Sequence, residues 1–246
     1  TVLVFLLFLI SPVSSGDELD QSQKLHRKTY MTSVEVMNYL AENLSLAWAS
    51  VYGEVDVNYS IREQINNLAL AKSKFEEFDR LLERYSDLKV TSKDGVKHKS
   101  IMLEQLYSSR PVLIEMIAQG DAVRLATESQ DTVVLEKADV EFMRQSILHL
   151  ESENASLSAA VYQIELWHPT LGLNQCIEAS NKVVIEMLRM FIAMNENPPP
   201  EDYLRSTVIS AQRHIRSLRG RITIGFKKAD ELVDLAKNDP RILGRT

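Results

Sequence analysis

Glu165 and His168 have the spacing of metal ligands on a helix. In a Glu-x-x-His motif both side chains project from one helix face, where they can hold a metal ion in the core of a helical bundle. A complete site of this kind also needs a second Glu-x-x-His and two further glutamates on facing helices, and the sequence contains only one such motif. His168 directly precedes Pro169, so we interpret it as a helix-terminal histidine and expect no metal and no other cofactor.

Four further histidines and the single cysteine are the other candidates for ligands or nucleophiles. His149 and Glu153 are one helical turn apart, which suits a metal site or a surface pair, and we favour the surface pair. Cys176 lies near His168 in sequence, but a Cys–His nucleophile requires contact in space, and we expect Cys176 to be buried. The remaining histidines are flanked by basic residues and are expected in solvent: His26, His98 and His214.

None of the common catalytic signatures occurs in the sequence. It has no phosphate-binding glycine-rich loop, no Gly-x-Ser-x-Gly, no His-Glu-x-x-His and no Cys-x-x-Cys. Carboxylates are plentiful, yet the pattern marks no pair of them as buried, so an acid–base pair is not indicated. We therefore expect a protein that is not an enzyme.

The best candidate for a binding surface is the basic face of the last predicted helix. No acidic residue occurs between Arg205 and Lys228. Five basic residues fall within about a third of the helix circumference, beside the apolar seam: Arg205, Arg213, Arg216, Arg219 and Lys227. Such a stripe can bind an acidic protein partner or a small anionic ligand. The alternative is a solvated face, or one neutralised by acidic residues elsewhere. Nucleic acid is not expected, because no aromatic residues are interleaved with the basic ones.

The N-terminal residues have the pattern of a secretory signal peptide. An uninterrupted apolar run from Val2 to Ile10 is followed by a proline and small residues, which suits cleavage after Ser15 or Gly16. We interpret residues 1–16 as a signal peptide and expect an exported protein, periplasmic or secreted. No Lys or Arg precedes the run, so a truncated membrane anchor and a buried first helix stay open as alternatives, although a spanning helix needs about 20 apolar residues.

The composition is that of an ordinary globular protein with long elements. The 246 residues carry a net charge of -6, and 45% of them are hydrophobic and 25% charged, which is typical of soluble domains. Only 8 glycines and 7 prolines are available for turns, so few connections are expected. A single cysteine excludes an internal disulfide.

Apolar residues recur at helical three-four spacing almost throughout, and no strand-like alternation of any length occurs. The pattern predicts an all-α fold, a bundle of long antiparallel amphipathic helices with coiled-coil-like seams. We expect about six or seven helical segments within residues 17–246, forming one bundle or two stacked bundles with a boundary near residues 120–130. The segments are expected at about 34–51, 61–85, 97–107, 109–120, 140–164, 173–194 and 201–237. Gly53 and the turn Ser92–Gly95 separate the first three.

The sequence also gives expectations for four aromatic residues and for three glycosylation sequons. Aromatic residues near the predicted helix ends are expected in the core rather than in a ligand pocket: Trp48, Tyr52, Tyr162 and Trp167. Three Asn-x-Ser sequons are candidate glycosylation sites in a eukaryotic secretory pathway: Asn43, Asn58 and Asn154.

Taken together, these patterns favour an exported, non-enzymatic helical bundle that binds a protein partner or an anionic ligand through its last helix. The first alternative is a membrane-active bundle of the pore-forming kind, whose amphipathic helices open onto lipid. The second is a metal- or cofactor-binding bundle enzyme centred on Glu165, His168 and His149.

Overall fold

The computed structural model describes residues 17–163, 168–195 and, further along the chain, residues 202, 205–206, 208–213 and 215–216. The regular elements of these residues are helices, and the helices pack against one another, so the predicted all-α bundle is confirmed. The long helices are α1 (Asp17–Val51), α2 (Val57–Asp87), α3 (Lys93–Ser129), α4 (Thr132–Gln163) and α5 (His168–Met194). The predicted signal peptide, residues 1–16, lies outside the described residues.

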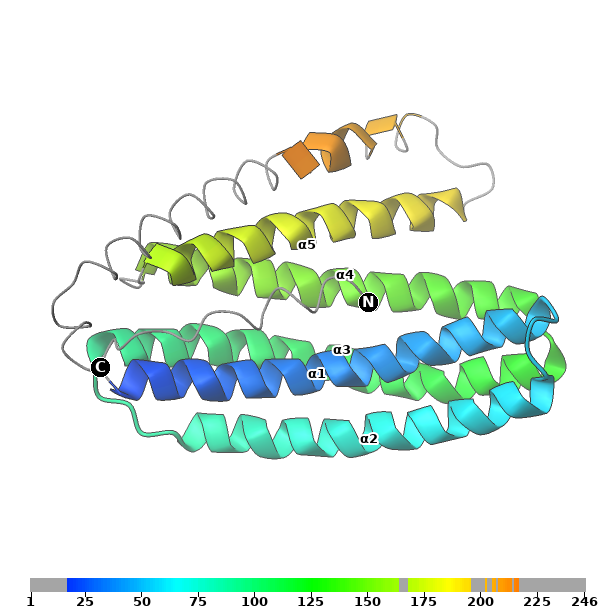
Figure 1. Ribbon diagram of the computed structural model, residues 1–246, viewed down its shortest axis with the longest axis horizontal. Coiled ribbons are helices and arrows are strands. Elements are labelled where there is room, and N and C mark those ends of the chain that lie inside the picture. Colours follow the sequence, from blue (N-terminus) through cyan, green and yellow to red (C-terminus); the bar gives the residue numbers. More distant parts are fainter. Residues whose placement is uncertain are drawn as a thin grey trace, which may run out of the picture.

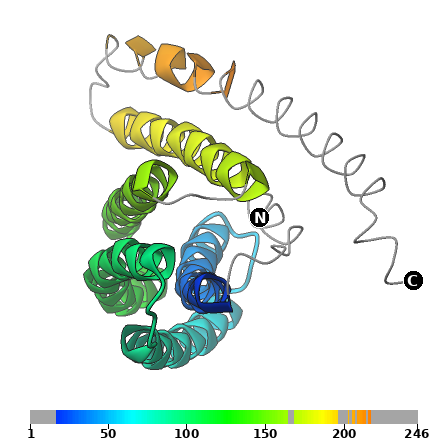
Figure 2. The same ribbon diagram turned by 90° about the vertical axis from the view of Figure 1, so that its left-hand side faces the viewer.

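The long helices run alternately up and down and stack in layers (Figure 1). α1 and α3 lie side by side in the middle of the bundle, with α2 against one side of the pair and α4 against the other. α5 packs on α4 and forms an outer layer (Figure 2). In both views the short helical pieces after residue 202 lie beyond α5. The core lies between α1, α2 and α3, with further buried residues from α4 and α5.

Both central helices carry their buried residues at a regular three-four spacing. In α1 the stripe is Ser22, Thr29, Ser33, Val36, Leu40, Asn43, Ala47 and Ser50, with the partly buried His26 completing it. In α3 it is Gly95, His98, Met102, Gln105, Ser109, Leu113, Met116, Gly120, Val123 and Thr127. This spacing keeps one face of each helix directed at its neighbours over its whole length. Since both stripes mix apolar and polar residues, the core contains polar groups that must find partners inside it.

The turns between α1 and α2 and before α3 are determined locally. Gly53 has a positive φ of +73°, which a residue without a Cβ adopts at little cost, and it ends the first helix as predicted. Asp56 caps α2, because its Oδ1 accepts a hydrogen bond of 3.0 Å from the backbone N–H of Tyr59. Ser92 caps α3 in the same way, accepting from the N–H of Gly95.

The expected helices 97–107 and 109–120 are one continuous helix, α3, so Pro111 does not lie in the first turn of a new helix and Gly120 does not end one. Pro111 is exposed, and the fully buried Leu106 and Leu113 on either side hold the helix against its neighbours despite the missing backbone donor. Gly120 marks a close approach of helices. A Cβ there would lie 2.7 Å from Cδ1 of Leu68 on α2, so this glycine serves packing rather than a turn.

One expectation about exposure is wrong, and one sequon is buried. Tyr52 stacks on Trp48 with ring centroids 5.8 Å apart, yet it is 72% exposed and lies outside the core. Asn43 is buried, and its Nδ2 donates to the backbone carbonyl of Gln64, so it is inaccessible to glycosylation in the folded chain.

Among the described residues no helix has an apolar stretch long enough to cross a membrane.

Candidate functional site

The described part of the predicted basic face is helical and exposed. Arg205, Arg213 and Arg216 all lie in helical pieces and all three are exposed. The other two predicted members of the face, Arg219 and Lys227, lie outside the described residues. We call the described residues from 205 to 216 the basic segment. Their charges are all positive, because no acidic residue occurs in this stretch.

Exposed apolar side chains share a face with these arginines. Val208, Ile209 and Ile215 are 40%, 51% and 50% exposed. At 100° per residue they fall, together with the three arginines, within an arc of roughly 160°. Ser210 and Ala211, which are only partly exposed, lie on the opposite side of the helix. The basic segment therefore presents a mixed cationic and apolar face outward.

The side chains of the candidate metal pair, Glu165 and His168, lie outside the described residues. Glu165 lies outside them, and His168 begins α5 with its side chain outside them, as does the side chain of Cys176. Among the residues that the structure describes, no group of three or more His, Cys, Asp and Glu side chains is placed to hold a metal ion.

Three histidines expected at the surface lie inside the bundle instead. His98 and His149 are 4% and 1% exposed, and His26 is partly buried. Glu153, expected to form a surface pair with His149, is 8% exposed. The correction has a simple cause. Flanking lysines and arginines describe the neighbours in sequence, whereas the three-four spacing of α1 and α3 places His26 and His98 on the inward faces.

These histidines belong to a chain of polar and aromatic side chains that crosses the bundle. At one end, Ser22 Oγ lies 2.9 Å from the hydroxyl of Tyr85 on α2 and 2.8 Å from Nδ1 of His98 on α3. The rings of His98 and His26 meet edge to face with centroids 5.9 Å apart. His26 Nε2 is 3.1 Å from Oε1 of Gln105. These contacts bind the N-terminal half of α1 to both α2 and α3.

The same chain continues through Tyr30 to α4 and α5. The Tyr30 ring stacks between His26 and His149, with centroid distances of 6.2 and 5.6 Å. Its hydroxyl is hydrogen-bonded to Glu153 on α4. Nδ2 of Asn181 on α5 donates to Oε2 of Glu153 at 2.7 Å. One connected set of side chains therefore links all five long helices.

Burial keeps the imidazoles of this chain neutral near pH 7. It lowers the pKa of His26 and of His149 to about 4 and, with the nearby His26, that of His98 to about 3. Burial also raises the pKa of Glu153, against hydrogen bonds from Tyr30 and Asn181 that favour its charged form. Both ring nitrogens of His149 lack a protein hydrogen-bond partner, and such an unpaired buried group weakens the fold. This connected set of side chains can take up protons when the bundle opens, and it presents no exposed nucleophile.

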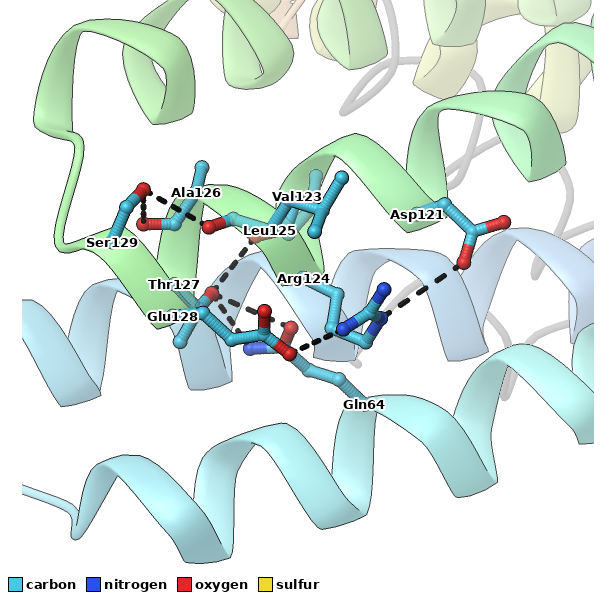
Figure 3. Close-up of polar contacts among 9 residues, drawn as sticks. All are labelled: Gln64, Asp121, Val123, Arg124, Leu125, Ala126, Thr127, Glu128 and Ser129. Carbon is cyan, nitrogen blue, oxygen red and sulfur yellow. Dashed lines mark hydrogen bonds and ion pairs between the residues drawn. The ribbon is translucent and has the colours of Figure 1, made fainter.

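A second polar layer lies nearer the other end of α2 and α3 (Figure 3). Nε2 of Gln64 donates to Oγ1 of Thr127 and to Oγ of Ser60, each at 3.0 Å, and the Thr127 hydroxyl donates to the carbonyl of Val123. Gln64 and Thr127 are both buried. Beside them Arg124 pairs with Glu128 at the surface. This layer fixes the register of α2 against α3, since a shift of either helix would leave buried amides unpaired.

Apolar periodicity alone does not predict these buried polar residues. Continuing the three-four spacing of Val36 and Leu40 towards the N-terminus reaches Ser33, Thr29 and His26 in turn. That signal is present in the sequence, although it does not say which partners the polar residues meet.

Comparisons with protein-family models, with curated proteins and with solved structures found no match.

Proposed function

We propose that this chain is an exported, non-enzymatic interaction protein that binds an acidic protein partner through the basic segment. The observation that carries the proposal is the outward arc of the segment, where Ile209 and Ile215 lie among Arg205, Arg213 and Arg216. Arginines desolvated beside apolar groups form stronger charge-assisted hydrogen bonds with carboxylates than they do in water. A partner with both carboxylates and apolar side chains fits such a face.

The mixture of residue types favours a protein partner over a lipid surface. A helix that lies in a membrane interface separates its apolar face from its basic face, and its apolar face is typically rich in Trp, Phe and Leu. In the basic segment the apolar residues are β-branched and share one arc with the arginines. Arginine at a partly apolar surface is typical of protein interfaces.

The interior of the bundle supports binding rather than catalysis. Its most polar cluster, around His98 and His149, is closed to solvent. Neutral imidazoles shut inside a bundle contribute to helix pairing, whereas a catalytic base needs a path to its substrate. The basic segment is therefore the feature on which we base function.

The proposal is tested by binding a labelled peptide with Glu and Leu residues alternating at helical spacing. We expect salt-sensitive binding that weakens at least tenfold in the Arg213→Glu/Arg216→Glu variant. A matched control, Arg80→Glu/Arg84→Glu, makes the same change of charge at exposed positions of α2 and should bind as the wild type does. Equal binding by all three proteins would overturn the proposal. Binding to vesicles of anionic lipid, with none to the peptide, would favour the membrane-active alternative.

The export part of the proposal rests on the apolar run and small residues within residues 1–16. The mass of the protein recovered from its own host tests it. A mass lacking the first 15 or 16 residues is expected, and a retained segment would require an anchor or a core helix in place of a signal peptide.

A further inference from the structure

One end of the bundle exposes apolar side chains around two helix connections. The α1–α2 and α3–α4 connections lie at the same end (Figure 1), where Nε2 of Gln130 is 3.3 Å from Oγ of Ser50. We call residues 51–63 and 121–139 the turn end. Three large apolar residues of the turn end are among the more exposed of the chain: Tyr52 at 72%, Val133 at 57% and Leu125 at 54%. Apolar side chains that gather on a surface are a feature of interaction sites.

The turn end is also strongly acidic. It contains eight acidic and three basic residues, a net charge of -5 in a chain whose total is -6. Of the basic residues, Arg124 already pairs with Glu128, and Arg62 lies over the ring of Tyr59. The acidic side chains with no structural role in the turns include Glu54 and Glu136, both exposed. Exposed apolar and acidic side chains therefore occur together at this end.

The basic segment is complementary to the turn end in both charge and polarity. It offers Arg213 and Arg216 interspersed with Ile209 and Ile215, and no acidic residue. In both views the segment lies on the outer side of α5, apart from the turn end of its own chain. Contact between the two surfaces then requires a second molecule.

We propose that the basic segment of one molecule docks on the turn end of a second copy, giving a head-to-tail assembly. This inference rests on the proposed function and names its acidic partner as the chain itself. The two surfaces differ, so the contact is heterologous, and it extends into open chains or closes into a ring according to the rotation between copies. The opposite charges steer association and make it weaken as salt is added.

Charge reversal on each surface provides the test. The basic variant is Arg213→Glu/Arg216→Glu. The acidic variant is Glu54→Lys/Glu136→Lys, which avoids the capping carboxylates Asp56 and Asp131. A control, Glu76→Lys/Glu83→Lys, makes the same charge change at exposed positions of α2. Sedimentation velocity and native mass spectrometry of the full chain then report assembly against concentration.

We expect wild type and control to form dimers and larger species whose association weakens at least tenfold from about 50 to about 300 mM salt. Each double variant should associate far more weakly. In the basic variant both surfaces carry a net negative charge, and in the acidic variant the net charge of the turn end falls from -5 to -1. Mixing the two double variants should give no long chains, since the altered basic segment and the altered turn end both have a net charge of -1. The remaining pair, a native basic segment with a native turn end, should form a one-to-one heterodimer.

Other results separate this inference from the proposed function. A wild type that binds the acidic peptide but stays monomeric at all salt concentrations would overturn self-association and leave the proposed function standing. A wild type that does neither would overturn both. Self-association that persists in both double variants would mean that these two surfaces do not form the contact, and the head-to-tail arrangement would be wrong.

Discussion

Acid should destabilise the bundle through its buried histidines. In the folded state the pKa is about 3 for His98 and about 4 for His149, whereas an unfolded histidine titrates near 6.5. Between these values the unfolded chain binds more protons than the folded one, so stability rises with pH. This contribution to stability is therefore fully present above about pH 7 and is lost progressively as the pH falls through the folded pKa values, about 4 for His149 and about 3 for His98.

The size of the loss follows from the proton-binding difference. From pH 7 to pH 5, each of these two histidines removes ~2 kcal/mol, or ~4 kcal/mol together. His26 acts in the same direction, because burial lowers its pKa too. Glu153 opposes them, since its raised pKa lets the folded state hold an extra proton in mildly acidic solution. A domain is typically stable by only about 5–15 kcal/mol, so the net loss should be large enough to measure.

The assay is urea unfolding followed by far-UV circular dichroism at several pH values between 7.5 and 5. His149→Phe removes one titrating group while keeping a ring to stack on Tyr30. Because neither nitrogen of His149 has a protein partner, we expect this variant to match or exceed the wild type at pH 7.5. It should lose ~2 kcal/mol less than the wild type on going to pH 5.

Met116→Leu is the matched control, because Met116 is 1% exposed in the same core and does not titrate. Its pH dependence should equal that of the wild type, whatever its absolute stability. A wild type with the same free energy of unfolding at pH 7 and pH 5 would refute the reasoning. So would a His149→Phe variant with an undiminished pH dependence, because the protons would then be taken up elsewhere.

Three further predictions concern stability and are checked by the same unfolding assay at pH 7.5. Thr127→Val should cost about 1–2 kcal/mol, because it removes one acceptor of the buried Gln64 amide. If the double variant Gln64→Leu/Thr127→Val costs no more than Gln64→Leu alone, the two side chains act as a pair. Asp56→Ala should cost about 1 kcal/mol through loss of the α2 cap, and Asp56→Asn should restore most of it. Leu113→Ala should cost about 2–5 kcal/mol, since Leu113 is fully buried between helices; a cost below 1 kcal/mol would contradict its place in the core.

The sequence by itself determined the fold class and many of the helix ends. Three-four spacing predicts amphipathic helices from local information alone, and Gly53 and Ser92 act through the backbone of their own turns. That Arg213 and Arg216 share one face also follows from spacing within a single helix. Features of this kind need no knowledge of what lies across the interface.

Only the tertiary structure decided which polar residues are buried and whether a helix continues through a proline or a glycine. Ser22 meets His98 and His26 meets Gln105 across 76 and 79 residues of sequence, and no local pattern specifies such partners. Pro111 stays within α3 because buried leucines on both sides hold that helix in the bundle. Periodicity states which residues share a face, whereas the choice of which faces meet depends on the packing of the whole chain. The burial and pKa values of the histidines follow from that choice.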